Sequence, residues 1–447
     1  MKTIIAGAGL VGCAMAICMK KQGHEVEVFE KRTDPRKDDL SSGRSINLIV
    51  TAKAINLFKN LGLWEEVQKI TVPVYGRMMH SMTGNLSYQA YGREDEYNNS
   101  VSRGMLNNLL IDKAESMGIK IHFDHAIEKV ELDKKEIIFE NKNEAYDKLF
   151  GCDGAGSKVR AAILEKLGDK AKYKVDPLGV DYKEFLMPST ASGEYAIDKK
   201  ALHIWPRGKH FLMALPNLDG SFTMTLYMPA DWYEKFNTPD LVENYFRENY
   251  ADALSLMPNL LEEYQKNPQG FLGTVRLSDW TYGDSVALLG DASHAIVPFF
   301  GQGMNCGMSD VEFFRSHADQ DWKTQLKNYS DQQKPNGNAI ADLSLENFVE
   351  MSEKVGDEKF LFRKKIESIL ETNFPDKYRS RYGLTVYTLT PYHIAQAAGE
   401  IQQELISELI RDIDSIEDLC LEKAEKLIDG MLTPWYKSRG VQLGKVI

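Results

Sequence analysis

Three glycines near the start of the chain, Gly7, Gly9 and Gly12, constrain its fold more than any other feature. They fall between an apolar run and a helix-forming run, so residues 2–30 are predicted to form a strand, a tight turn, a helix and a second strand. Gly7 permits the turn, Gly9 lets a pyrophosphate approach the backbone, and Gly12 lets the helix pack on the strand. Glu30, at the end of the second strand, can accept ribose hydroxyls. This combination predicts a βαβ unit that binds a dinucleotide, with the helix N-terminus facing the phosphates.

The same stretch has a rival interpretation as a secretory signal peptide. Residues 3–19 are almost free of charge, with Lys2 before them and Lys20 and Lys21 after them. A signal-peptide core does not require glycines at phosphate-loop spacing, and this one runs directly into a strand. We therefore interpret it as a buried strand followed by a helix over residues 13–22. A glycine-rich turn without a ligand is the other alternative, and the strand, the helix and the acid together disfavour it.

Charge and cysteine content exclude several classes of protein. The formal net charge of -11, without a long basic block, argues against nucleic-acid binding and favours a small-molecule partner. The five cysteines are widely spaced and form no Cys-x-x-Cys pair or zinc pattern, so we expect no metal, no disulfide and a cytoplasmic location. The chain also has no run of about 20 apolar residues, the length that a membrane span requires.

The pattern along the chain changes three times, which predicts a discontinuous domain. Alternating strands and turns dominate residues 173–275, a buried strand returns at residues 286–290, and helical periodicity dominates after residue 310. The predicted class is α/β, or α+β overall, with an inserted antiparallel β-sheet substrate domain and a helical C-terminal region. The predicted segments are residues 1–172 and 276–330 for the dinucleotide-binding domain, 173–275 for the sheet and 331–447 for the helices.

A second motif identifies the dinucleotide. Gly290-Asp291 ends a buried strand, and the segment that follows, residues 292–305, resembles glutathione-reductase-type flavoproteins, in which an acid at this position holds the ribityl chain of FAD. An acid at a strand end can accept a ribityl hydroxyl, and the helix after Gly301 and Gly303 can present its positive end to reduced flavin. His294 lies within this motif, and we expect it to pack or to form hydrogen bonds rather than act as a base.

A third motif indicates the type of flavoprotein. Residues 152–160, Cys-Asp-Gly-Ala-Gly-Ser-Lys-Val-Arg, resemble the Asp-Gly motif of flavoprotein hydroxylases, which lies near FAD and the pyridine nucleotide. From the residues alone, this segment is a strand-to-helix turn with Ser157 as the helix N-cap. No second glycine motif occurs in the chain, which favours a single-component hydroxylase over a reductase with two nucleotide-binding domains.

Longer segments narrow the resemblance to the kynurenine 3-monooxygenase family. They are residues 43–48, 203–207, 214–217 and 298–305. The resemblance implies a Rossmann-like FAD-binding domain and hydroxylation of L-kynurenine to 3-hydroxy-L-kynurenine by NADPH and O2, through a flavin C4a-hydroperoxide. Animal members carry a membrane-anchoring tail, whereas this chain ends in an acidic amphipathic helix, predicted from apolar residues at 401, 405, 409, 413 and 416. We therefore expect no membrane association, and a homodimer is possible.

The resemblance also assigns site residues. The substrate contacts would be Arg77, Tyr91, Asn347 and Tyr382, and an always-charged planar guanidinium suits the kynurenine carboxylate. From the residues alone, Arg77 would be a surface ion-pair partner and the tyrosines half-buried aromatics. The FAD contacts would be Gly7, Gly9, Val11, Gly12, Glu30, Arg32, Ile49, Arg103, Asp291, Met304 and Asn305.

Two other functions remain open at this point. One is hydroxylation of another aromatic acid, for which the cofactor motifs would be the same. The other is a flavin-free protein on the same fold, which the complete glycine motif and the two acids disfavour. We expect no separate catalytic side chain in a hydroxylase of this kind, because the flavin carries the chemistry.

Overall fold

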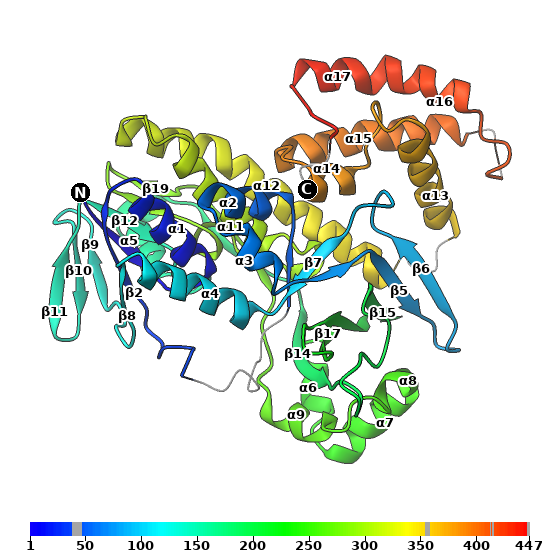
Figure 1. The fold of residues 1–447 in the computed structure, drawn as a ribbon, viewed down its shortest axis with the longest axis horizontal. Helices are drawn as coiled ribbons and strands as arrows, with labels where there is room; N and C mark the ends of the chain where they lie inside the picture. Colours follow the sequence, from blue (N-terminus) through cyan, green and yellow to red (C-terminus); the bar gives the residue numbers. More distant parts are fainter. Residues whose placement is uncertain (38–46, 354–357, 412, 414, 445–447) are drawn as a thin grey trace.

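The computed structural model describes residues 1–37, 47–353, 358–411, 413 and 415–444. Part of one segment that carries the family resemblance, Gly43 to Ile46, lies outside the described residues. The protein is built around two six-stranded sheets, with helices that cover the first sheet and form the C-terminal end (Figure 1).

The first sheet is mainly parallel and has β1 near its centre. Its strands, in spatial order, are β19 (Thr281–Tyr282), β20 (Val286–Leu288), β12 (Lys148–Gly151), β1 (Lys2–Ala6), β2 (Glu25–Phe29) and β8 (Lys120–His122). β19 is antiparallel to its neighbour β20, and the other pairings are parallel. The strand at residues 286–288 joins this sheet beside β12, so the predicted return of a buried strand from late in the sequence is confirmed.

The uncharged N-terminal stretch is buried in this sheet and in the helix that follows. Helix α1 (Leu10–Lys21) begins three residues before the predicted start at Cys13, so that Gly12 lies in its first turn. It packs against α4 (Arg103–Ser116) and α11 (Gly303–Ser316). Its residues from Cys13 to Met19 are at most 1% exposed. Burial on every side therefore accounts for the lack of charge that resembled a signal peptide.

The second sheet carries the other half of the site and combines strands from two parts of the chain. Its order is β14 (Val180–Met187), β17 (Phe222–Pro229), β16 (His210–Pro216), β15 (Ala201–Arg207), β5 (Gly76–His80) and β6 (Leu86–Ala90). β5 and β6 precede residue 172, which was the predicted boundary of the sheet domain. β15 pairs with β5 in parallel, whereas the other pairings are antiparallel as predicted.

Four helices interrupt the segment that was predicted to be an inserted antiparallel β-sheet domain. They are α6 (Trp232–Lys235), α7 (Pro239–Asn249), α8 (Ala251–Leu254) and α9 (Leu260–Lys266). They bury Val242, Tyr245 and Phe246 against the second sheet on the face away from the first sheet. The antiparallel sheet is confirmed, whereas these helices were not predicted. Thr238, whose side chain caps α7, and Pro239 in its first turn were the available signals.

Three smaller sheets accompany the two large ones. The predicted small antiparallel element is confirmed as β9 (Lys129–Glu131) and β10 (Glu136–Phe139), with β11 (Lys142–Ala145) as its third strand. The remaining strands are β3 (Leu48–Val50), β7 (Asn98–Val101) and β4 (Val72–Val74) in one sheet, and β13 (Tyr173–Pro177) with β18 (Gly273–Leu277) in another.

The predicted helical C-terminal region is confirmed. After α11 come α12 (Trp322–Glu353), α13 (Glu358–Asn373), α14 (Arg381–Tyr387), α15 (Tyr392–Leu409), α16 (Leu421–Leu427), a π-helical turn (Ile428–Leu432) and α17 (Thr433–Ser438). The shorter helices of the rest of the chain are α2 (Ala52–Leu61), α3 (Trp64–Gln68), α5 (Lys158–Leu167) and α10 (Asp291–His294). In Figure 1 the long α12 runs beneath the orange and red C-terminal helices.

The last predicted helix is shorter than its periodicity suggested. α15 ends at Leu409, whereas the pattern predicted a helix that continues through Ile413 to Ile416. Aspartates and a serine follow Arg411, and these residues have low helix propensity and place negative charge at the negative end of the dipole. Ile416 still packs on the C-terminal core, from a segment that is not helical. Within the described part of the chain, no helix has the length and apolar character needed to cross a membrane.

Candidate active site

The glycine motif forms a tight turn that leaves open space only above Gly9. Gly7 has φ +97°, and a Cβ there would lie 2.6 Å from the carbonyl oxygen of Cys152. A Cβ on Gly12 would overlap the carbonyl oxygen of Gly7, so Gly12 allows α1 to pack on β1 as predicted. A Cβ on Gly9 would meet nothing within 4 Å. Gly7 and Gly9 line a cavity, and the space above Gly9 is where a phosphate could approach the backbone.

Glu30 lies beside this turn and is 6% exposed. Its Oε2 accepts a hydrogen bond from the N–H of Ala8 at 2.9 Å, and its Oε1 accepts from the N–H and the Nε of Arg32 at 3.0 and 3.1 Å. Burial favours the neutral acid, but the backbone N–H donors of Arg32 and Ala8 hold the pKa of Glu30 below its ordinary value. Glu30 is therefore an ordered anion at the edge of the cavity, with acceptor capacity left for ribose hydroxyls.

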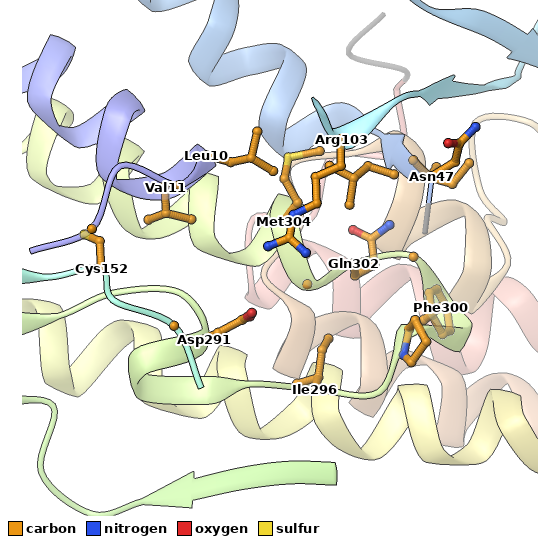
Figure 2. A pocket seen from close by; sticks show the side chains of 18 of the residues that line it. Leu10, Val11, Asn47, Arg103, Cys152, Asp291, Ile296, Phe300, Gln302 and Met304 are labelled. Atoms are coloured by element: carbon orange, nitrogen blue, oxygen red, sulfur yellow. The ribbon is translucent and has the colours of Figure 1, made fainter. Parts of the chain in front are cut away.

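The second motif forms the opposite wall of the same cavity. Gly290 has φ +59° and would place a Cβ 3.1 Å from Val11, so this turn packs closely against the glycine motif. Asp291 follows at the start of α10 and is exposed to the cavity. In Figure 2, the side chains of Asp291 and Arg103 point into the same space, between Val11 and Met304. An acid and a base from sequence positions far apart are thus available to one bound molecule.

The N-terminus of α11 also faces this cavity. Gly301 has φ +66° and turns the chain, and α11 begins at Gly303 with Met304 in its first turn. These residues and Gln302 line the cavity. Free N–H groups at a helix N-terminus carry partial positive charge, so this end stabilises an anionic group placed before it.

One cavity of about 460 Å³ gathers most of the predicted site residues. From the predicted FAD set, it is lined by Gly7, Gly9, Val11, Glu30, Arg32, Ile49, Arg103, Asp291 and Met304. From the predicted substrate set, it is lined by Arg77, Tyr91 and Tyr382. The three remaining residues, Gly12, Asn305 and Asn347, lie behind its wall.

Asn305 and Asn347 hold the walls in place. Asn305 Nδ2 donates to the carbonyl oxygen of Ile49 at 2.7 Å, and its Oδ1 accepts from the N–H of Thr51 at 2.9 Å, so it ties β3 to α11. Asn347 is buried in α12, and its Nδ2 donates to the carbonyl oxygen of Phe299 at 2.6 Å. Both side chains therefore fix backbone segments that line the cavity.

The Asp-Gly motif also lies at the cavity. Cys152, Asp153, Gly154, Gly156 and Lys158 line it. Ser157 caps α5 as predicted, because its Oγ accepts from the N–H of Arg160 at 2.9 Å. Asp153 receives hydrogen bonds from the Ser157 hydroxyl at 2.6 Å and from the Lys158 N–H at 2.7 Å. The motif thus forms a rigid floor below the glycine turn.

The prediction that His294 has a structural role is confirmed. The residue is buried, its ring is tilted against that of Trp280 at a centroid distance of 4.9 Å, and its Nε2 lies 2.7 Å from Asp310 Oδ2. Asp310 Oδ2 also accepts from the N–H of Gly290 at 2.9 Å. The pair therefore fixes the turn that carries Asp291.

Arg77 stands at the opposite end of the cavity from the glycine motif, among aromatic rings. Its guanidinium carbon is 5.4 Å from the centroid of the Tyr91 ring, and Tyr91 stacks on Tyr382 at 5.5 Å with an interplanar angle of 9°. Burial opposes its charge, but the Tyr91 and Tyr382 hydroxyls hold the pKa of Arg77 above its ordinary value. Burial raises the pKa of both tyrosines, so both remain neutral phenols. Arg77 is therefore a cation held by neutral neighbours.

The walls beside Arg77 are apolar. Leu202, Leu215, Tyr227, Phe299 and Met351 line the cavity there and belong to one hydrophobic cluster with β5 and β15. This end therefore suits a flat, apolar ring that carries a single anionic group.

The polar residues that line the cavity but were not predicted as site residues include Gln302, Asn98 and His125. The buried Gln302 bonds through its Oε1 to Tyr392, while its Nε2 has no hydrogen-bond partner among the described residues. Asn98 donates to the Tyr382 hydroxyl at 2.9 Å. His125 reaches the cavity because its N–H bonds to the carbonyl oxygen of Glu30 at 2.9 Å. Gln302 lies inside a motif that could have suggested it, whereas Asn98 and His125 had no local signal.

The donor set fits FAD. Glu30, at the end of β2, lines the cavity together with Gly9. Asp291 and the positive N-terminus of α11 line the same cavity. Gln302 immediately precedes that helix end, and its buried Nε2, which has no hydrogen-bond partner among the described residues, provides a donor for a carbonyl or ring nitrogen. In this order, the features would suit the ribose, the ribityl chain and the ring system of FAD.

Comparison with known proteins supports this reading. Residues 1–335 match the family model described as an FAD binding domain. The chain is 39% identical over 446 residues to a kynurenine 3-monooxygenase of Myxococcus xanthus. The alignment covers 97% of this chain and 96% of the relative. The chain belongs to the kynurenine 3-monooxygenase family. A Flavobacterium psychrophilum member is 40% identical over 93% of this chain, and a Dictyostelium discoideum member is 37% identical over 95%.

Solved structures show the same fold for this family member. A tetrameric form of 2-methyl-3-hydroxypyridine-5-carboxylic acid oxygenase aligns with a TM-score of 0.67 at 19% identity, and covers 82% of this chain and 95% of that chain. Pseudomonas aeruginosa PqsL in complex with 2-aminobenzoylacetate aligns with a TM-score of 0.62 at 18% identity and covers 78% of this chain. The kynurenine 3-monooxygenase-family chain is thus an FAD-dependent monooxygenase with the flavoprotein hydroxylase fold, an enzyme class that uses NADPH and O2.

Proposed function

We propose that the protein hydroxylates L-kynurenine to 3-hydroxy-L-kynurenine, with one NADPH and one O2 consumed and one water released. The observation that carries the substrate assignment is Arg77, a cation among neutral tyrosines at the apolar end of the flavin cavity. L-Kynurenine has a flat aniline ring and an amino-acid carboxylate, and this end offers an apolar wall for the first and a guanidinium for the second. The names of the curated relatives point to the same substrate.

The FAD site supplies electrostatics and position. Bound FAD supplies the redox chemistry, by accepting hydride from NADPH and reducing O2. Asp291 and Glu30 would accept ribityl and ribose hydroxyls, and the N-terminus of α11 would stabilise negative charge on the ring system. The Gln302 amide would donate the hydrogen bond that its buried Nε2 lacks.

Arg77 would orient the substrate. Its fork of N–H donors can hold the kynurenine carboxylate bidentately, and its Nε has no hydrogen-bond partner among the described residues. The neutral hydroxyls of Tyr91 and Tyr382 would complete the polar contacts without competing for the guanidinium charge. The substrate ring would then lie against the apolar wall that faces the flavin.

The apolar wall would also exclude water. Leu202, Leu215, Phe299 and Met351 surround the space beside Arg77. Water that enters such a site diverts reduced oxygen to hydrogen peroxide instead of product, so exclusion protects the coupling of NADPH consumption to hydroxylation.

We also propose a cytoplasmic location. The five cysteines are all unpaired, and Cys13, Cys18 and Cys306 are buried as thiols. Unpaired thiols are usual in a reducing compartment.

The decisive experiment measures NADPH consumption and product mass with three compounds. L-Kynurenine is compared with 2′-aminoacetophenone, which keeps the aniline ring but lacks the carboxylate, and with 4-hydroxybenzoate. We expect L-kynurenine alone to accelerate NADPH consumption and to gain one oxygen. Hydrogen peroxide is measured in parallel, because uncoupled oxidation consumes NADPH without product. If 4-hydroxybenzoate is hydroxylated and L-kynurenine is not, the substrate assignment is wrong while the flavin assignment stands.

A further inference from the structure

A buried ion pair outside the cavity connects the two tyrosines to the C-terminal helices. Glu96 lies between β6 and β7, and Arg379 lies just before α14, yet Arg379 Nη2 contacts Glu96 Oε1 directly. Both side chains are 0% exposed. Neither residue lines the cavity, so neither belongs to the site described above.

Each residue of the ion pair lies close to the glycine that follows one of the two tyrosines. Gly92 follows Tyr91, and a Cβ on Gly92 would overlap Glu96 Oε2. Gly383 follows Tyr382, and a Cβ on Gly383 would lie 2.9 Å from Glu371 Oε1 and 3.1 Å from the Cγ and Nε of Arg379. The ion pair therefore touches the backbone beside both members of the Tyr91–Tyr382 stack.

Other contacts fix the pair itself. Glu96 Oε2 accepts from the N–H of Arg93 at 3.0 Å, which closes the loop after Tyr91. The carbonyl oxygen of Arg379 accepts from Gln402 Nε2 of α15 at 2.6 Å. Arg379 Nε is 3.9 Å from Glu371 Oε1, but burial raises the pKa of Glu371, so Glu96 is the main counter-charge. A continuous series of contacts therefore runs from α15 through Arg379 and Glu96 to the loop after Tyr91.

We infer that the Glu96–Arg379 ion pair positions the Tyr91–Tyr382 stack, and through it the pocket around Arg77. Glu96 and Arg379 are positioning residues, because they act through the tyrosines and do not touch the substrate. The inference rests on the proposed substrate site. It assigns a function to the C-terminal helices, which hold one wall of the pocket in register with the second sheet.

The test must separate positioning from stability, because a buried charge without its partner destabilises the fold. Glu96→Gln leaves Arg379 unpaired, whereas the double variant Glu96→Gln/Arg379→Met removes both charges and is expected to fold well. Glu425→Gln is the control for loss of a carboxylate, since it makes the same change to an amide in the exposed ion pair with Lys377. Gly430→Ala is the control for the helical region, since a Cβ there meets nothing within 4 Å.

The measurements are FAD content, half-saturation by L-kynurenine, and the ratio of 3-hydroxykynurenine to NADPH consumed. For the double variant we expect normal FAD content, half-saturation raised roughly 10- to 100-fold and a reduced coupling ratio, because small misplacements at a reacting centre have effects of this size. Both controls should match the wild type. A double variant with wild-type half-saturation and coupling, or a Glu425→Gln variant that loses as much as Glu96→Gln, would overturn the inference.

A crystal structure of the double variant gives a readout that does not depend on the substrate. We expect the Tyr91 and Tyr382 rings to leave the parallel stack that now has a 5.5 Å separation. An unchanged stack would contradict the positioning role, even if wild-type protein proved not to use L-kynurenine. A wild type that ignores L-kynurenine while the stack moves in the variant would instead contradict the proposed function alone.

Discussion

Arg77 gains its importance from its surroundings rather than from its type. The same residue on an exposed strand would form a surface ion pair of little energetic value. Here it lies on β5 beneath the Tyr91 ring, and its Nε has no hydrogen-bond partner among the described residues. A half-buried cation whose Nε is buried without a partner carries an energetic cost that a bound carboxylate would offset.

Replacement of Arg77 by Met should therefore weaken apparent L-kynurenine affinity by about 2–5 kcal/mol, because the carboxylate is left buried without a counter-charge. Lysine should restore only part of this, since an ammonium lacks the planar fork. The measurement is a titration of NADPH consumption and hydroxylated product against L-kynurenine. FAD content should not change, which serves as the internal control. Unchanged half-saturation with full coupling in Arg77→Met would return the residue to a structural role.

Glu30→Ala should weaken FAD retention for two reasons. It removes the acceptor for ribose hydroxyls, and it deprives the Ala8 N–H of its 2.9 Å partner within the phosphate turn. We expect FAD affinity to fall at least tenfold, about 1.4 kcal/mol or more. Glu30→Gln, which keeps one acceptor oxygen, should lie between Ala and wild type. Flavin fluorescence after dilution and gel filtration measures the loss, and a fully loaded Glu30→Ala protein would rule out this role.

At the scale of elements, the β1–α1 turn distinguishes a glycine needed for folding from one needed for binding. Alanine at Gly12 would collide with the carbonyl oxygen of Gly7, whereas alanine at Gly9 would point into open space. Gly12→Ala should therefore lower the free energy of unfolding of the flavin-free protein, by about 1–3 kcal/mol as for other overpacked sites. Gly9→Ala should leave that value near wild type and reduce FAD affinity instead. Equal stability losses in the two flavin-free variants would contradict this division.

The elements that the sequence predicted well are those with their own local pattern. β1, α1 and β2 carry glycines, a buried run and an acid at fixed spacing, and the acid at residue 291 follows a wholly apolar strand. The pairing of β5 with β15 had no such signal, because strands paired in parallel carry no mark of their partner in a single sequence. Helix α7 had a capping threonine and a proline, but the strands on either side suggested continued alternation.

At the scale of the whole molecule, part of the stability should depend on pH through His210. Burial, and then the nearby Arg207, lower the pKa of His210 to about 4, and its Nδ1 lies 2.6 and 2.7 Å from the hydroxyls of Tyr245 and Tyr250. The unfolded chain takes up a proton near pH 6.5, whereas the folded chain does so only near the lower value. Stability is therefore complete above the unfolded pKa and declines as the pH falls through this window.

We expect the free energy of unfolding to decrease by about 1–3 kcal/mol between roughly pH 7 and pH 4.5 on account of this histidine. Urea titrations at several pH values measure the decline, and His210→Asn should make it shallower. A slope that is the same in the variant and the wild type would show that other groups control acid stability.

Site residues could be predicted where a local motif and the chemistry of the ligand both require one residue type. Asp291 and the glycine turns are examples, and both lie where the motif suggested. The meeting of Arg77 with Tyr382 depends on α14 folding over β5, and the two residues are about 300 positions apart, beyond the reach of periodicity. The ion pair between Glu96 and Arg379 could not be predicted for the same reason. In the sequence, the two residues cannot be distinguished from surface charges.

The origin of β5 and β6 in the first hundred residues has a consequence for recombination. A chimera that exchanges residues 173–275 with those of a related hydroxylase would import β14 to β17, but Arg77 and Tyr91 would stay with the recipient. Substrate preference in such a chimera should follow the parent that contributes the N-terminal hundred residues and α14. A change of substrate preference would then require substitutions on both sides of residue 172, in the N-terminal hundred residues and in α14.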